Sequence, residues 1–159
     1  GVIHIVDAVI TLPSVVTFAA ADAATFSELV GALTRADQPD YVSVLTTANG
    51  TAPAPFTVFA PTNQAFADLY AELGVAGIDD VDGAILTATL NTHVVAGANV
   101  RAEDLVTGTV ATLGDAVEID ATTAIITDPN GRTSQVIVTN VQAANGVIHA
   151  IDTVLLPQL

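Results

Sequence analysis

The chain has 159 residues, of which 17 are acidic and 3 basic, giving a formal net charge of −14 at pH 7. A surface this negative repels phosphate backbones and anionic headgroups, so we expect no nucleic-acid partner and no binding to membrane surfaces. Cysteine is absent, which excludes disulfides, thiol nucleophiles and thiolate metal sites.

The first residues of the chain nearly repeat its last ones. GVIHIVDAVI at position 1 matches the ten residues from position 146 at six places, with an offset of 145 residues, about one domain length. We therefore predict that residues 1–13 are the terminal segment of a preceding domain plus a linker, and that 14–159 form one complete domain. Residues 1–6 are apolar β-formers without a sheet of their own, which predicts docking on this domain or weak self-association through residues 1–13.

Helical spacing dominates the first half of the chain. Apolar residues at that spacing, with Asp22 as the cap, predict a helix within 21–37. Residues 40–50 predict a second, short helix, and the apolar run 56–60 predicts a strand after a proline-broken loop. The uncharged run 41–67 contains prolines and asparagines that a membrane-spanning helix would not carry together, so we expect no direct membrane insertion.

Two further helices are predicted before the midpoint. Thr62 is placed to cap a helix that ends at Gly74, and a fourth helix follows over 84–94. The acidic stretch before the fourth helix makes Asp80 and Asp82 weak candidates for calcium. Helix capping is the favoured interpretation, because the positions where a calcium loop needs its first and last carboxylates are not acidic.

From Val100 the pattern changes to short β-rich runs. They cover 109–113, 116–120, 123–127, 134–139 and 146–154, and the turn sequences GD, DPNG and AANG lie between them. Helices in the first half and strands in the second predict an α+β fold rather than alternating βαβ units.

The histidines fit structural roles better than catalytic ones. His93 shares a helix face with Leu86 and Leu90, which favours a buried, hydrogen-bonded ring with a lowered pKa over a ligand role. His149 and Asp152 fall on opposite faces of one strand and cannot form a dyad. We expect Asp152 to be buried and bound to backbone N–H groups or threonine hydroxyls.

No motif indicates catalysis. The four serines lie outside any nucleophile-elbow context, and HExxH, P-loop and GxGxxG patterns are absent. We expect no enzymatic activity and no cofactor.

Three blocks resemble the fasciclin domain family. FTVFAPTNQAF (56–66), LNTHVVAG (90–97) and NGVIHAIDTVLLP (145–157) stand in the order of that family's first signature block, central Tyr-His block and second signature block. The resemblance covers 14–159 and implies a wedge-shaped β-sandwich with a helical layer formed mainly by the N-terminal half. The structural signature residues it implies are Thr57, Phe59, Pro61, Thr62, Phe66, His93, Asn145, Gly146, His149 and Asp152.

The resemblance also implies a function. Fasciclin domains are extracellular or cell-surface adhesion modules, usually in tandem, so we expect a non-enzymatic module that binds a matrix protein, a polysaccharide or another fasciclin-like domain. The candidate ligand-binding residues are Asn63, Gln64, Thr92 and His93, with Thr92 standing where the family commonly has tyrosine. The alternative is a structural spacer repeat with no ligand of its own. An exposed apolar or aromatic patch would favour the binding module.

Overall fold

The computed structural model describes residues 3, 5 and 12–158, so most of the segment 1–13 lies outside the described residues. The helices are α1 (Val15–Ala21), α2 (Ala23–Thr34), α3 (Tyr41–Leu45), α4 (Asn63–Leu73), α5 (Gly83–Thr92) and the 3₁₀ turns η1 (Ile78–Asp80) and η2 (Ala102–Asp104). The strands are β1 (Phe56–Pro61), β2 (Val94–Ala96), β3 (Gly108–Val110), β4 (Val117–Asp120), β5 (Ile125–Thr127), β6 (Thr133–Ala143) and β7 (Gly146–Ile151).

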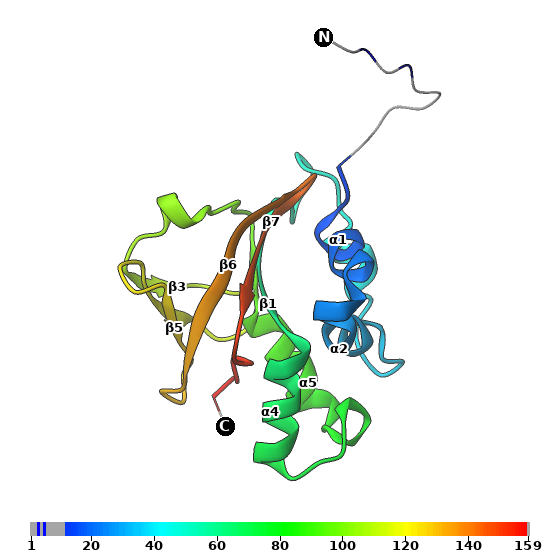
Figure 1. The fold of residues 1–159 in the computed structure, drawn as a ribbon, viewed down its shortest axis with the longest axis vertical. Coiled ribbons are helices and arrows are strands. Elements are labelled where there is room, and N and C mark those ends of the chain that lie inside the picture. The colour runs from blue at the N-terminus through cyan, green and yellow to red at the C-terminus, as the bar shows by residue number, and fades with distance from the viewer. Residues whose placement is uncertain (1–2, 4, 6–11, 159) are drawn as a thin grey trace.

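The strands form a continuous seven-stranded sheet in the order β2-β1-β7-β6-β5-β4-β3. β1 and β7 are parallel neighbours, and the other pairs are antiparallel. β6 is long and carries two irregularities in its pairing with β7, between Val136 and Val138 and between Val138 and Val141. Such bulges bend a strand. β3–β5 lie on one side of the central strands and α1–α2 on the other (Figure 1).

The central strands separate two apolar cores. Phe56, Val58 and Ala60 of β1 join a cluster with residues of the five α-helices. Phe59, on the other face of β1, packs with Ile151 and the inner residues of β4 and β5. Every residue of β1 and β7 is buried, which explains why these strands are mostly apolar on both faces rather than alternating.

The predicted caps are largely confirmed. The Thr62 hydroxyl accepts a hydrogen bond from the backbone N–H of Ala65, and α4 ends at Gly74 in the left-handed conformation. Asp82 accepts from the N–H groups of Ala84 and Ile85 and caps α5. Asp22 stands at the N-cap of α2 without a side-chain capping bond.

Two elements differ from the sequence-based prediction. α1 was not predicted, because its run of valine and alanine has no amphipathic period; Ser14 caps it, and packing on the sheet buries Val15 and Ala19. β2 was not predicted, and its first residue, Val94, was placed at the end of the fourth helix. The helix instead stops at Thr92, and the next residues pair with β1. In both cases tertiary contacts override local pattern.

Gly146 lies where two backbones come close together. A Cβ atom at residue 146 would lie 2.2 Å from the carbonyl oxygen of Phe56, in the neighbouring strand. Backbone atoms of a buried strand cannot move aside cheaply, so only glycine fits at this position.

We therefore expect Gly146→Ala to lower the free energy of unfolding by about 1–3 kcal/mol. Denaturant unfolding of the variant and of the unchanged protein measures this. Gly77→Ala is the matched control, because no atom lies within 4 Å of its Cβ position and its backbone is extended. Equal losses in the two variants would show that steric contact at residue 146 is not the cause.

Candidate functional site

The three sequence blocks that carry the family resemblance meet at the centre of the molecule. β1 from the first block and β7 from the second pair in parallel over six residues, from Phe56–Gly146 to Pro61–Ile151. Asn145 joins this pair to the helical layer, because its side chain accepts from the N–H of Val15 and donates to the carbonyls of Leu45 and Thr47. These blocks therefore hold the fold together at its core.

His93 is buried at the end of α5, as its apolar helix face predicts. Its Nε2 atom accepts the backbone N–H of Leu155 at 3.0 Å, so the ring proton is on Nδ1, which donates to the carbonyl of Thr89 at 2.7 Å. Burial lowers the pKa of His93 to about 4, although the Thr89 carbonyl and the Asp128 charge act in the opposite direction. The neutral ring thus ties α5 to the C-terminal segment.

His149 and Asp152 also point to structural roles. His149 is buried beside Phe59, and its Nε2 donates to the Val100 carbonyl at 3.0 Å, while its Nδ1 atom has no partner. Burial lowers the pKa of His149. Asp152 accepts from the Gln135 N–H and the Thr153 hydroxyl, which confirms the expected bonding. The expectation that Asp152 is buried is wrong, because β7 ends at Ile151 and the next residue reaches the surface.

Asp128 anchors the segment that follows β7. Its carboxylate is 4% exposed and accepts three backbone N–H groups, from Asn130 and Arg132 in its own turn and from Leu156. Arg132 donates to the carbonyl of Val154. Sequence reasoning missed this anchor, since DPNG was interpreted only as a turn.

The four candidate ligand-binding residues do not form one site. Thr92 and His93 are buried, so a partner does not reach them in this structure. The Asn63 side chain accepts the N–H of Glu28 and donates to carbonyls at the start of α2. Gln64 is exposed and donates to Asp68. Of the four, only Gln64 is fully presented to solvent.

The acidic stretch before α5 is used in backbone hydrogen bonds. Asp82 caps α5, as the capping interpretation predicts, and Asp80 accepts the N–H of Ala76. Within the described ranges, no group of three or more histidines and carboxylates is arranged to hold a metal ion. No helix in that part of the chain is long and apolar enough to cross a membrane.

An apolar groove lies between α1–α2 and the β6–β7 pair. Its volume is about 200 Å³, and Phe18 and Phe26 line the helical side while Ile137, Val138 and Val141 line the side of β6. Ile137 and Val138 are 50% and 49% exposed, although they belong to a strand. Among the residues that the structure describes, Asp22 is the one charged residue that lines the groove. The sequence signal for this groove is the unbroken apolar run Val136–Val138. A strand with one buried face needs an apolar residue only at every second position.

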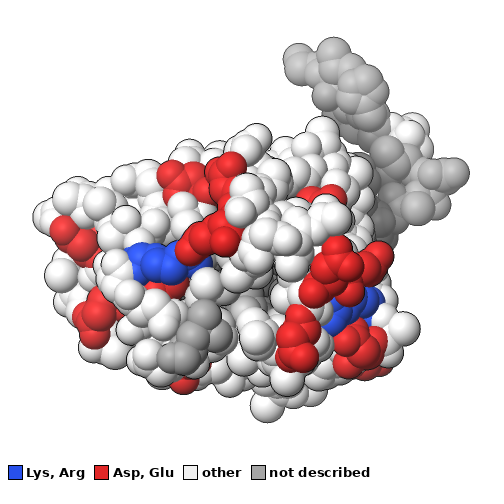
Figure 2. Space-filling model, turned by 90° about the horizontal axis from the view of Figure 1, so that it is seen from below, with Lys and Arg blue, Asp and Glu red and all other residues white. Residues whose placement is uncertain are grey.

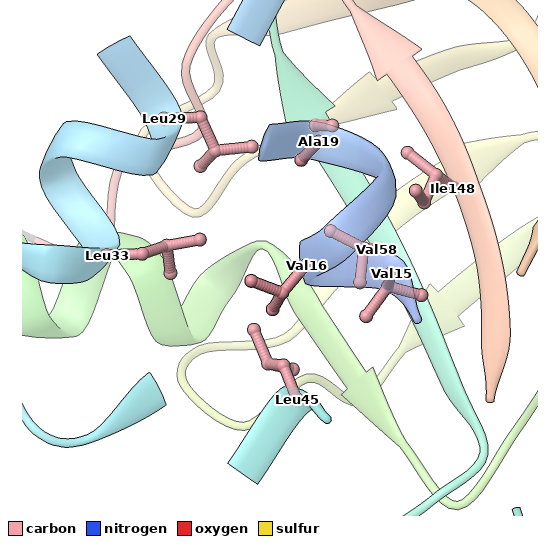
Figure 3. A pocket seen from close by; sticks show the side chains of 9 residues that line it. Val15, Val16, Ala19, Leu29, Leu33, Leu45, Val58 and Ile148 are labelled. Atoms are coloured by element: carbon pink, nitrogen blue, oxygen red, sulfur yellow. The ribbon is translucent and has the colours of Figure 1, made fainter. Parts of the chain in front are cut away.

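A smaller cavity lies deeper under the helices. Figure 3 shows Val15, Val16 and Ala19 of α1 facing Leu29 and Leu33 of α2 across it. Its volume is about 20 Å³, which is room for one water molecule, and its lining is wholly apolar. It is a packing space of the core rather than a ligand site.

The surface of the protein is predominantly negative. The three arginines each lie beside a carboxylate: Arg35 binds Asp37 at 2.7 Å, Arg132 binds Glu72 at 2.8 Å, and Arg101 lies 3.8 Å from Glu103. Figure 2 shows acidic side chains gathered around the arginines on the face it presents. The arginines are therefore already neutralised, and the surplus of carboxylates faces solvent.

The family model for the Fasciclin domain matches residues 24–157. An uncharacterized protein of Synechocystis sp., sll1735, is 34% identical over 146 residues, which cover 91% of this chain and 98% of that one. The cell surface glycolipoprotein MPB83 of Mycobacterium bovis is 35% identical, and the match covers 89% of this chain and 60% of that protein.

Among solved structures, the FAS1 domain pair from the insect cell adhesion molecule Fasciclin I matches with a TM-score of 0.69 and 19% sequence identity. The match covers 94% of this chain and 51% of the insect chain, so this chain spans about half of that protein. It confirms the expected α+β, fasciclin-like fold, in which the strands form one seven-stranded sheet.

We expect the protein to lose stability as the pH falls from about 6.5 to about 4, because His93 is neutral in the folded state while an unfolded histidine binds a proton in that range. The loss attributable to His93 is on the order of 2–3 kcal/mol. Denaturant unfolding at several pH values measures it. His93→Gln cannot take up the proton, so its stability should fall less steeply over the same range; an equal slope would contradict the assignment.

The excess of negative charge predicts that chloride salts stabilise the fold, because ions screen repulsion between carboxylates. The thermal unfolding midpoint should rise between 0.1 and 1 M NaCl. The double variant Asp68→Asn/Asp104→Asn carries less charge at exposed positions and should show a smaller rise. A midpoint that is independent of salt would contradict the expectation.

Proposed function

Because this chain belongs to the fasciclin domain family, we propose that it is a non-enzymatic binding module of a cell-surface or secreted protein, acting in adhesion or matrix binding. The name of the mycobacterial relative, a cell surface glycolipoprotein, supports a surface location. The module holds its partner by surface complementarity, without covalent chemistry. Its partner is a matrix protein, a polysaccharide or another fasciclin-like domain.

The observation that carries the proposal is the groove between α1–α2 and β6–β7. An exposed apolar patch in a soluble domain commonly marks an interaction site. Here Ile137 and Val138 keep half of their side chains in water beside Phe18 and Phe26, at a place where the helical layer leaves the sheet partly uncovered. Asp22 and the acidic surroundings favour a partner that carries positive charge or is bridged by cations.

A structural spacer is the second candidate. Every phenylalanine and tyrosine of the chain is buried or half-buried, so the surface offers none of the exposed aromatic anchors that are enriched at binding sites. In this case the repeat lengthens a larger surface protein, and adhesion depends on other parts of it.

Binding to an array of matrix proteins and glycans separates the two candidates. A binding module gives specific signals that Val138→Asp reduces by about tenfold or more, since the variant places a charge in the apolar groove. Val106→Asp is the matched control, because Val106 is 77% exposed and lies outside the groove. A blank array, or signals that both variants leave unchanged, would favour the spacer. Repeating the binding measurement at low and high salt tests whether the acidic surface attracts a partner that is positively charged or bridged by cations.

A further inference from the structure

One side of the groove carries a carboxylate that the fold itself does not use. Asp22 lines the groove and is half-buried at the junction of α1 and α2. Its side chain makes no capping bond to α2, and no residue that the structure describes forms a hydrogen bond or an ion pair with it. The arginines lie beside other carboxylates. The charge of Asp22 is therefore available to a group from outside the chain.

The rest of the groove is apolar and has the size of one large side chain. Phe26 of α2 and Ile148 and Ala150 of β7 line it and are almost fully buried. Its volume of about 200 Å³ is smaller than the roughly 300–1,000 Å³ of pockets that enclose a whole small-molecule ligand. It is larger than the roughly 150 Å³ cavity that holds a benzene ring. A leucine or phenylalanine side chain of a partner therefore fits it.

The groove lies beside an open edge of the sheet. β5 pairs with β6 only from Thr133 to Gln135, so the rest of β6 pairs on one side alone, with β7, among the described strands. The open stretch ends at Asn140, which has a φ of 60° and accepts the N–H of Ala102 with its side chain. Residues 137–139 before it are exposed. An edge of this kind accepts an extended segment as an added strand.

We propose that the groove binds an extended segment of a partner protein in which a large apolar side chain stands two residues from a lysine or arginine. The apolar side chain fills the groove, the cation pairs with Asp22, and the backbone of the segment adds to β6 at 137–139. Alternate side chains of an extended segment point to the same side, which sets the spacing of two. This inference rests on the proposed binding role of the groove and names the chemical class of its partner.

Charge and polarity together select a basic protein segment. The chain has a net charge of −14, so it repels an acidic segment and attracts a basic one before contact. Among the described residues that line the groove, only Asp22, Thr25 and Thr62 have polar side chains. A sugar carries several hydroxyl groups, and each of them needs a hydrogen-bond partner when it is buried. The groove does not supply these partners, whereas an apolar side chain needs none.

Selection from a library of random seven-residue peptides displayed on phage tests the proposal, with the whole chain as the target. Peptides that also bind Val138→Asp are removed by counter-selection. The remaining peptides should combine leucine, isoleucine or phenylalanine with a lysine or arginine two residues away. A remaining set that is neutral or acidic, or the absence of any peptide that distinguishes the two proteins, would overturn the proposal.

The pairing of the cation with Asp22 is tested with the best of these peptides, by fluorescence anisotropy. Asp22→Asn removes the charge at constant shape and should weaken binding by about threefold to tenfold. Asp68→Asn removes an exposed charge outside the groove and is the matched control. Replacing the cation of the peptide by glutamine should weaken binding to the unchanged protein by a similar factor and binding to Asp22→Asn no further. Equal losses in Asp22→Asn and Asp68→Asn would contradict the pairing.

Nuclear Overhauser contacts between backbone protons of the bound peptide and those of residues 137–139 report the added strand. A complex without these contacts would overturn the pairing with β6. The outcome for the proposed function is separate. Polysaccharides that bind the protein and lose affinity in Val138→Asp, when no peptide is selected, would leave the binding role of the groove intact and overturn the basic segment as its partner. Absence of binding to peptides, matrix proteins and glycans alike would count against both.

Discussion

The fold depends on the burial of β1 and β7 on both faces. Because the two strands are parallel neighbours, the residues that turn towards the helices stack in one layer, and those that turn towards β3–β5 stack in another. Each strand therefore contributes to both cores at once. At the start of this pair, Gly146 lies too close to the backbone of Phe56 for any side chain to fit between them.

Polar groups buried near this pair bind it to its neighbours. Asn145 joins the start of β7 to α1 and to the loop after α3, while His93 and Asp128 hold the segment beyond its other end. Each of these groups satisfies backbone atoms that no strand or helix partner reaches. His93 and Asp128, of residue types that often take part in catalysis, serve here as connectors between segments.

Much of this arrangement could be predicted from sequence, where local chemistry decides the outcome. Thr62 and Gly74 bound α4 as expected, because capping depends on neighbouring residues alone. α1 and β2 could not be predicted, because both take their structure from distant partners. α1 is a run rich in valine and alanine, and β2 is formed by the three residues after His93. The groove was missed for the same reason. Ile137 and Val138 look like core residues in the sequence, and their exposure results from bulges in β6 and from the position of the helices.

The anchors at the two ends of β7 have a mechanical consequence. Residue 13 is fixed beside the turn that precedes this strand, through Ala144, and residue 158 is fixed beyond its far end, through Asp115. Tension applied between those points is directed along the strand and loads its hydrogen bonds to β1 and β6 in shear, all together. Hydrogen bonds loaded in this way resist more force than bonds that open one after another.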